Sequence, residues 1–165
     1  MSDSIDAFVE QFQAEMFKQS LETFGETFCR RWQEPTHMGI LPDADASAQL
    51  KGNCGDSMCI YLKFENDRVT SASFQTDGCG PSIVCASLAA EMSVGKSPEE
   101  LLDLSAEEVI APLGTLPEEH KHCAFLAAAT VHSAVDRYMI QQLEQKLNID
   151  NATPQAAKPS KSEAI

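Results

Sequence analysis

The sequence is poor in basic residues. It has 12 lysine and arginine residues against 25 aspartate and glutamate residues, which gives a formal net charge of −13. Nucleic acids and anionic membrane surfaces attract basic patches, so this charge argues against both as partners. No stretch approaches the roughly 20 apolar residues of a spanning helix, and the first residues lack the pattern of a secretory signal. We therefore expect a cytoplasmic protein that binds neither nucleic acid nor membrane.

Several common motifs are also missing. The chain has no Walker loop, no dinucleotide fingerprint and no Cys-x-x-Cys pair, and nothing in it indicates a serine triad. Its six cysteines come without an export signal, so they indicate reduced thiols rather than a disulfide framework. At 165 residues the chain is long enough for one domain with a real core and too short for two large ones.

Apolar residues at steps of three and four predict a long amphipathic helix over residues 1–32, with a break near Gly25. This stripe consists of Ile5, Phe8, Val9, Phe12, Met16, Phe17, Leu21, Phe24 and Phe28. We favour packing of the stripe against the domain's own core. A dimer or partner face is the alternative, because five phenylalanines are many for one helix of a small domain.

The following residues, 33–147, predict an α+β domain. Alternating apolar and polar residues predict strands at 46–51, 57–64 and 69–76, and the short turns between them imply an antiparallel meander. Helices should then cover one face of this sheet. Their predicted starts are Pro81, capping boxes at Ser97 and Ser105, and a further box at Thr115 that heads the last long helix. Residues 148–165 are polar and predict a disordered tail.

Three cysteines lie in settings that are typical of metal ligands. Glycines flank Cys54 and Cys79 and let a ligand approach closely, and Cys123 directly follows His122. Asp56 adds a carboxylate next to the first of them. These five donors could hold zinc or an iron–sulfur cluster.

The predicted topology brings the three cysteines together. Cys54 precedes the second strand and Cys79 follows its antiparallel neighbour, so both should lie at one end of the hairpin. Cys79 also precedes a helix N-terminus, where free N–H groups favour a thiolate. His122 and Cys123 would approach from a third segment, near the start of the last helix.

The other three cysteines are interpreted as structural. Cys29 ends the apolar stripe, Cys59 lies inside a strand, and Cys85 lies on a helix where a small buried side chain fits. His120 is close to the candidate site in sequence but is not expected to be a ligand.

The motifs Cys54-Gly55-Asp56, Gly78-Cys79-Gly80 and His122-Cys123, with Leu116-Pro117 before the last, resemble those of the NifU/IscU-type iron–sulfur cluster assembly scaffolds. The resemblance covers roughly residues 34–138. It implies a three-stranded antiparallel sheet with helices on one side. It also implies a carrier, not an enzyme, that takes sulfur from a cysteine desulfurase and iron from a donor. Such a scaffold assembles a transient [2Fe–2S] cluster and passes it to apo-proteins.

The resemblance also implies a role for each donor. Cys54, Cys79 and Cys123 would be the thiolate ligands of the cluster. Asp56 would be a weak oxygen ligand that keeps the cluster labile, and His122 an alternative ligand. Cys123 would also carry a persulfide in transit. The apo-site could hold zinc, and the chain could form a homodimer.

A zinc-containing sulfurtransferase of the SufU kind is the alternative function. There Cys54, Asp56, Cys79 and Cys123 would hold zinc while a thiol accepts sulfur. That group usually carries an insertion between its second and third cysteines, and the uninserted interval here favours the scaffold. A purely structural zinc site is disfavoured by the aspartate. One departure from the family is the segment 116–120, where a chaperone-recognition stretch often reads Leu-Pro-Pro-Val-Lys and this chain reads Leu-Pro-Glu-Glu-His.

Overall fold

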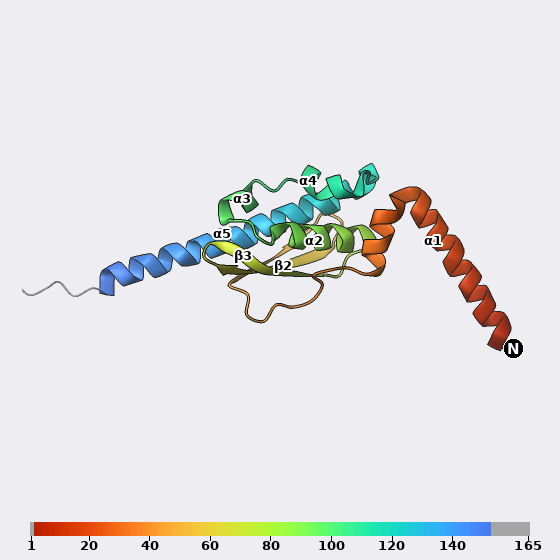
Figure 1. Cartoon of the computed structure of the whole chain (residues 1–165), viewed down its shortest axis with the longest axis horizontal. Helices are drawn as coiled ribbons and strands as arrows, with labels where there is room; N and C mark the ends of the chain where they lie inside the picture. Colours follow the sequence, from red (N-terminus) through yellow and green to blue (C-terminus); the bar gives the residue numbers. More distant parts are fainter. Residues whose placement is uncertain (1, 153–165) are drawn as a thin grey trace, which may run out of the picture.

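The structure, a computed structural model that describes residues 2–152, has an α+β fold in two layers (Figure 1). Three strands form a sheet, and helices pack on one of its faces. The strands are β1 (Ala46–Lys51), β2 (Ser57–Glu65) and β3 (Arg68–Thr76), which pair antiparallel in the order β1-β2-β3. The expected fold class and meander are confirmed.

Side-chain alternation along β2 decides which face of the sheet is covered. Met58, Ile60 and Leu62 are fully buried, whereas the residues between them are half-buried on the opposite face. The register sets Met58 of β2 opposite Thr76 of β3. The start of β2 and the end of β3 therefore lie side by side, and the loops at that end of the sheet carry the candidate ligands.

The two longer helices of the domain, α2 (Gly80–Ser93) and α5 (Lys121–Ala152), form the layer that packs on the sheet. Alanines such as Ala89 and Ala127 are fully buried and let these helices approach each other and the strands closely. Shorter elements connect the two. They are α3 (Pro98–Leu102) and α4 (Ala106–Ile110), with single 3₁₀ turns at Ala111–Leu113 and Glu118–His120.

Two of the three predicted capping boxes are confirmed. The side chains of Ser97 and Ser105 each accept a hydrogen bond from the backbone of a glutamate three residues later, and that glutamate bonds back. The box at Thr115 is wrong. The backbone at Pro117 is extended (φ −52°, ψ 144°), so Pro117 instead precedes the 3₁₀ turn Glu118–His120, and α5 begins only at Lys121.

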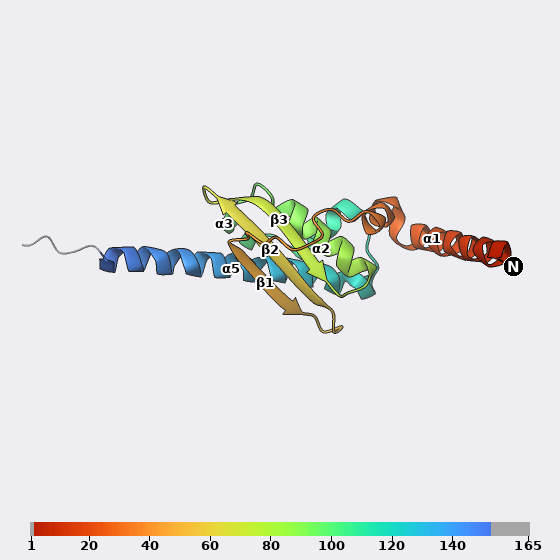
Figure 2. The same cartoon turned by 90° about the horizontal axis from the view of Figure 1, so that it is seen from below.

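The N-terminal helix α1 (Ser2–Gln33) breaks where the sequence predicts, at Gly25, whose φ of 82° is a conformation that glycine adopts readily. After the break, Phe28 is buried in the core. Before it, the helix leaves the body, and residues such as Phe8 and Phe12 are more than half exposed (Figures 1 and 2). Packing of the whole stripe against the core is therefore wrong for its first half, because the break turns that half away.

The C-terminal helix is longer than the sequence predicts. It continues to Ala152, past the boundary placed at residue 147, so the start of the expected tail is helical. Residues 153–165, which hold the rest of that predicted tail, lie outside the described residues. Within residues 2–152 no helix is both long and apolar enough to cross a membrane.

Candidate metal centre

Three segments carry the candidate ligands to the end of the sheet. Cys54 lies in the turn between β1 and β2, which is closed by the Gly52 N–H donating to the Asp56 carbonyl at 2.8 Å. Cys79 is the residue that precedes α2 and provides no side-chain cap, so its thiol is left for other partners. Cys123 lies in the first turn of α5.

Ser82 joins these segments, although the sequence pattern assigned it no role as a ligand. Its hydroxyl is fully buried and donates to the Asp56 carboxylate, with Oγ and Oδ2 2.8 Å apart. The same Oγ lies 3.4 Å from the Sγ of Cys123 and 4.0 Å from the Sγ of Cys79. A hydroxyl has one proton, so Ser82 can donate either to the Asp56 carboxylate or to the sulfur of Cys123, and the two groups share this donor. Two sequence signals point to Ser82: it lies one helical turn after Cys79, and with Ile83 it belongs to the stretch after Cys79 that resembles the scaffold family.

Gly78 makes room for this arrangement. A Cβ atom at this position would lie 2.5 Å from the Oδ2 of Asp56 and 2.7 Å from the Oγ of Ser82, both far inside van der Waals contact. A Cβ at Gly80 would meet the indole of Trp32 at 3.2 Å, which is a milder approach. The glycine before Cys79 is therefore needed for close approach of the carboxylate to α2.

The three thiols differ in their exposure. Cys54 and Cys79 are exposed, whereas Cys123 is fully buried. Burial raises the pKa of the Cys123 thiol to about 11, the hydrogen bond from Ser82 opposes this rise, and Cys79, Cys54 and Asp56 add to it by their negative charge. The thiol of Cys123 is consequently neutral at physiological pH in this conformation. The hydrogen bonds of Ser82 place Asp56, Cys79 and Cys123 around one hydroxyl.

His122 lies beside this cluster, with its Nε2 atom 3.5 Å from the Sγ of Cys123. The predicted ligands thus converge, but within residues 2–152 no three side chains that could be ligands are already close enough to hold one metal ion. Ser82 instead occupies the place between carboxylate and thiol. Three soft thiols with one hard carboxylate and one imidazole are a donor set that suits iron or zinc. Binding would require Asp56 to turn from Ser82 toward the cargo.

The residues interpreted as structural lie away from this cluster or are inaccessible. Cys29 and Cys85 are buried, and burial raises the pKa of Cys85 to about 12. Cys59 is half-buried on the face of the sheet opposite Met58. The ring of His120 packs against Phe24 of α1, with centroids 5.5 Å apart. The interpretation of these residues agrees with their positions.

Comparison with known proteins defines the class. The sequence model of the NifU-like N terminal domain matches residues 24–145, so the chain belongs to this family. Over 109 residues it is 39% identical to the iron–sulfur cluster assembly scaffold protein IscU 1 of Archaeoglobus fulgidus. This match covers 65% of this chain and 71% of that protein. Over 123 residues it is 34% identical to the scaffold protein IscU of Aquifex aeolicus, with 72% of this chain and 78% of that protein covered.

A solved structure supports the same fold. It is that of a candidate iron–sulfur cluster assembly scaffold protein for the SUF system from Fervidobacterium islandicum. The TM-score is 0.57 at 20% identity, over 70% of this chain and 98% of that one. The resemblance drawn from the motifs is therefore confirmed at the level of family and fold.

Proposed function

We propose that this chain is a scaffold on which an iron–sulfur cluster is assembled and from which it passes to apo-proteins. A cysteine desulfurase supplies the sulfur and a separate donor supplies the iron. The observation that carries the proposal is the convergence of Cys54, Asp56, Cys79 and Cys123 from three segments at one end of the sheet. Relatives that share this domain are named as scaffolds of this kind.

The exposure of the thiols suggests an order of events. Cys54 and Cys79 are accessible and meet the incoming iron first. Cys123 is buried behind Ser82, so it takes part only after the turn around Cys54 or the start of α5 moves. As persulfide acceptor, its thiolate would attack the outer sulfur of the desulfurase persulfide. That sulfur–sulfur bond would break and the desulfurase thiolate would leave.

Asp56 makes the cargo labile. A carboxylate is a hard ligand and binds a soft iron–sulfur centre less tightly than a fourth thiolate would. Ser82 offers this carboxylate an alternative partner at 2.8 Å, which competes with the metal. His122, within 3.5 Å of Cys123, is placed to replace Asp56 as a ligand. A [2Fe–2S] cluster bound in this way can be built and then released.

The remaining expectations belong to the same proposal. The chain acts as a carrier rather than as an enzyme with turnover of its own, and residues 33–147 form the scaffold domain. A reducing compartment such as the cytoplasm suits it, because its six cysteines are all free. Zinc can occupy the apo-site, since it readily takes vacant thiolates.

Anaerobic reconstitution tests the proposal. The chain is incubated with ferrous iron, cysteine and a desulfurase, while visible absorbance and acid-labile sulfide are measured. We expect a chromophore in the wild type, its loss in Cys79→Ser, and its retention in Cys59→Ser, which removes a thiol from the far face of the sheet. Equal chromophores in both variants would overturn the assignment of the site.

The zinc-containing sulfurtransferase remains the second candidate. It is supported by a donor set of three thiols and a carboxylate that also suits zinc. It predicts a different result in the same experiment. The wild type would form no chromophore, would retain zinc, and would accelerate sulfide release by the desulfurase.

A further inference from the structure

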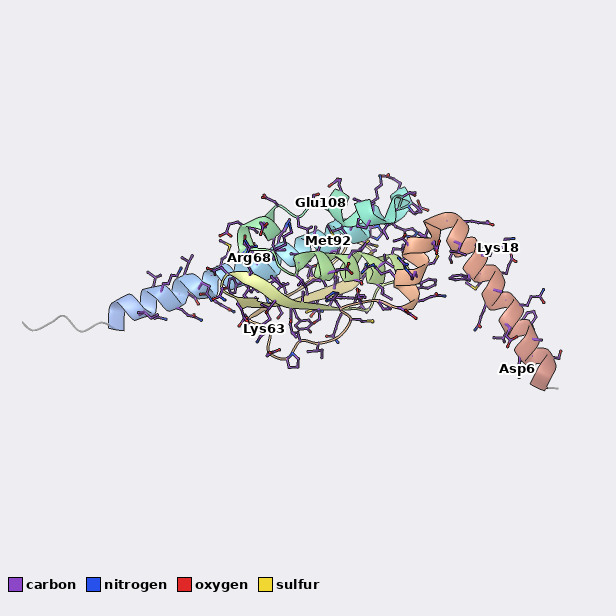
Figure 3. The ribbon with its side chains drawn as sticks, viewed as in Figure 1. Asp6, Lys18, Lys63, Arg68, Met92 and Glu108 are labelled. Carbon is purple, nitrogen blue, oxygen red and sulfur yellow. The ribbon has the colours of Figure 1, made fainter. Side chains whose placement is uncertain are left out.

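The first half of α1 is an addition to the family domain. The family match begins at residue 24, next to the break at Gly25. Residues 4–24, called the arm below, extend from the body, with Lys18 nearer to the body and Asp6 farther out (Figure 3). Its exposed apolar side chains are Ile5 (65% exposed), Phe8 (68%), Val9 (42%), Phe12 (58%) and Met16 (53%).

These five side chains share one face of the arm. At about 100° per residue their positions fall within roughly one third of the helix circumference. The rings of Phe8 and Phe12 stack with centroids 6.4 Å apart, so the face is continuous. A neighbouring face of the arm is turned inward, where Phe17 and Trp32 line a groove of about 640 Å³, and Met16 lies at the edge of both because it also lines this groove. Each of the five residues nevertheless stays between 42% and 68% exposed within the described part of the chain.

We propose that this face pairs with the same face of a second copy of the chain, with the two arms antiparallel. The spacing of the apolar residues is nearly symmetric about a point between Glu10 and Gln11. A two-fold axis there sets Val9 against Phe12 of the second copy, and Ile5 against Met16 of the second copy, with Phe8 beside these contacts. Each contact then occurs twice, and the assembly closes at two chains.

The area is sufficient for a weak dimer. Taking the exposed fractions above with side-chain areas of about 150–200 Å², the face offers roughly 500 Å² per copy. Pairing buries about 1,000 Å² in total, which is near the lower limit for a specific interface. We expect a dissociation constant in the micromolar range rather than an obligate dimer.

Charge favours this antiparallel geometry over close contact of the bodies. Two chains of net charge −13 repel each other. The arm extends away from the body of its own chain (Figure 2), so antiparallel pairing of two arms would place the two bodies at opposite ends, farther apart than the screening length of about 8 Å at physiological salt. The arm itself has one basic residue, Lys18, and four acidic ones, of which Glu15 lies at the edge of the paired face and Glu10 nearly opposite it. Salt should therefore strengthen the dimer, whereas it would weaken binding to a basic partner.

Sedimentation equilibrium of the full chain tests the proposal without any cluster, so its outcome is independent of the proposed function. We expect a reversible dimer that is several-fold tighter at high than at low salt. Phe8→Ser with Phe12→Ser should weaken it at least about tenfold. Ala7→Ser with Ala14→Ser, on the other side of the arm, should leave it unchanged, and circular dichroism checks that all variants fold.

Four results would overturn the proposal. A wild type that stays monomeric at several hundred micromolar would mean that a different protein covers the face. A dimer that persists in the Phe8 and Phe12 variant would place the interface elsewhere. Growth beyond two chains would indicate an open head-to-tail contact. A dimer weakened by salt would be held by charge rather than by the apolar face.

Discussion

Replacing Ser82 by alanine tests whether the hydrogen bond from this residue to Asp56 stabilises the cluster-free site. The change deletes only Oγ, which is fully buried and donates to the Asp56 carboxylate at 2.8 Å. A hydrogen bond to a charged group contributes about 1.5–3 kcal/mol. Asp56 is half-buried and can recruit water after the loss. We therefore expect Ser82→Ala to lower the free energy of unfolding by about 1–2 kcal/mol.

Urea denaturation measures this change. With a slope of about 2 kcal/mol per molar urea, the midpoint should fall by roughly 0.5–1 M. Ser93→Ala is the matched control, because Ser93 is also fully buried on α2 but donates only to the carbonyl of Ala89. That control should cost less than about 0.5 kcal/mol. Equal midpoints for the two variants would refute the role given to Ser82.

Three further predictions concern neighbouring positions. Asp56→Ala should prolong the lifetime of a bound cluster, followed by decay of visible absorbance, and equal or faster decay would contradict the weak-ligand role. Gly78→Ala should lower the urea midpoint more than Gly80→Ala, because its Cβ would lie 2.5 Å from the Oδ2 of Asp56, at a cost of about 1–3 kcal/mol. Burial raises the pKa of Cys85 from about 9 to about 12. The unfolded thiol therefore ionises first, and stability that is intact below pH 9 should fall toward pH 12, by on the order of 4 kcal/mol. Cys85→Ala should remove that part of the slope, and an unchanged slope would show that Cys85 does not cause it.

The fold follows closely from local sequence signals. Alternation in β2 and the capping boxes at Ser97 and Ser105 are short-range patterns, and the structure confirms them. The predicted capping box at Thr115 did not form, because the same sequence pattern occurs there with an extended backbone at Pro117. The prediction that the first apolar residues of the arm pack against the core was wrong for a related reason. Periodicity shows that a helix has an apolar face, but the turn at Gly25 decides what that face meets.

The sequence proposes donors for the site but not the contacts between them. Glycine and histidine neighbours selected Cys54, Cys79 and Cys123, and the hairpin argument placed the first two at one end of the sheet. The burial of Cys123 and the contacts of Ser82 could not be predicted in this way. Both depend on how closely α2 and α5 pack, which is set by tertiary contacts between segments about 40 residues apart.

The most direct test of the account is transfer of a cluster. The reconstituted chain is mixed anaerobically with an apo-ferredoxin and a chelator that captures free iron, and the spectrum of the acceptor is followed. We expect the acceptor to gain its cluster despite the chelator, while the absorbance of the scaffold falls, and Cys79→Ser to transfer nothing. A chain that retains zinc, forms no cluster and only accelerates the desulfurase would contradict the account.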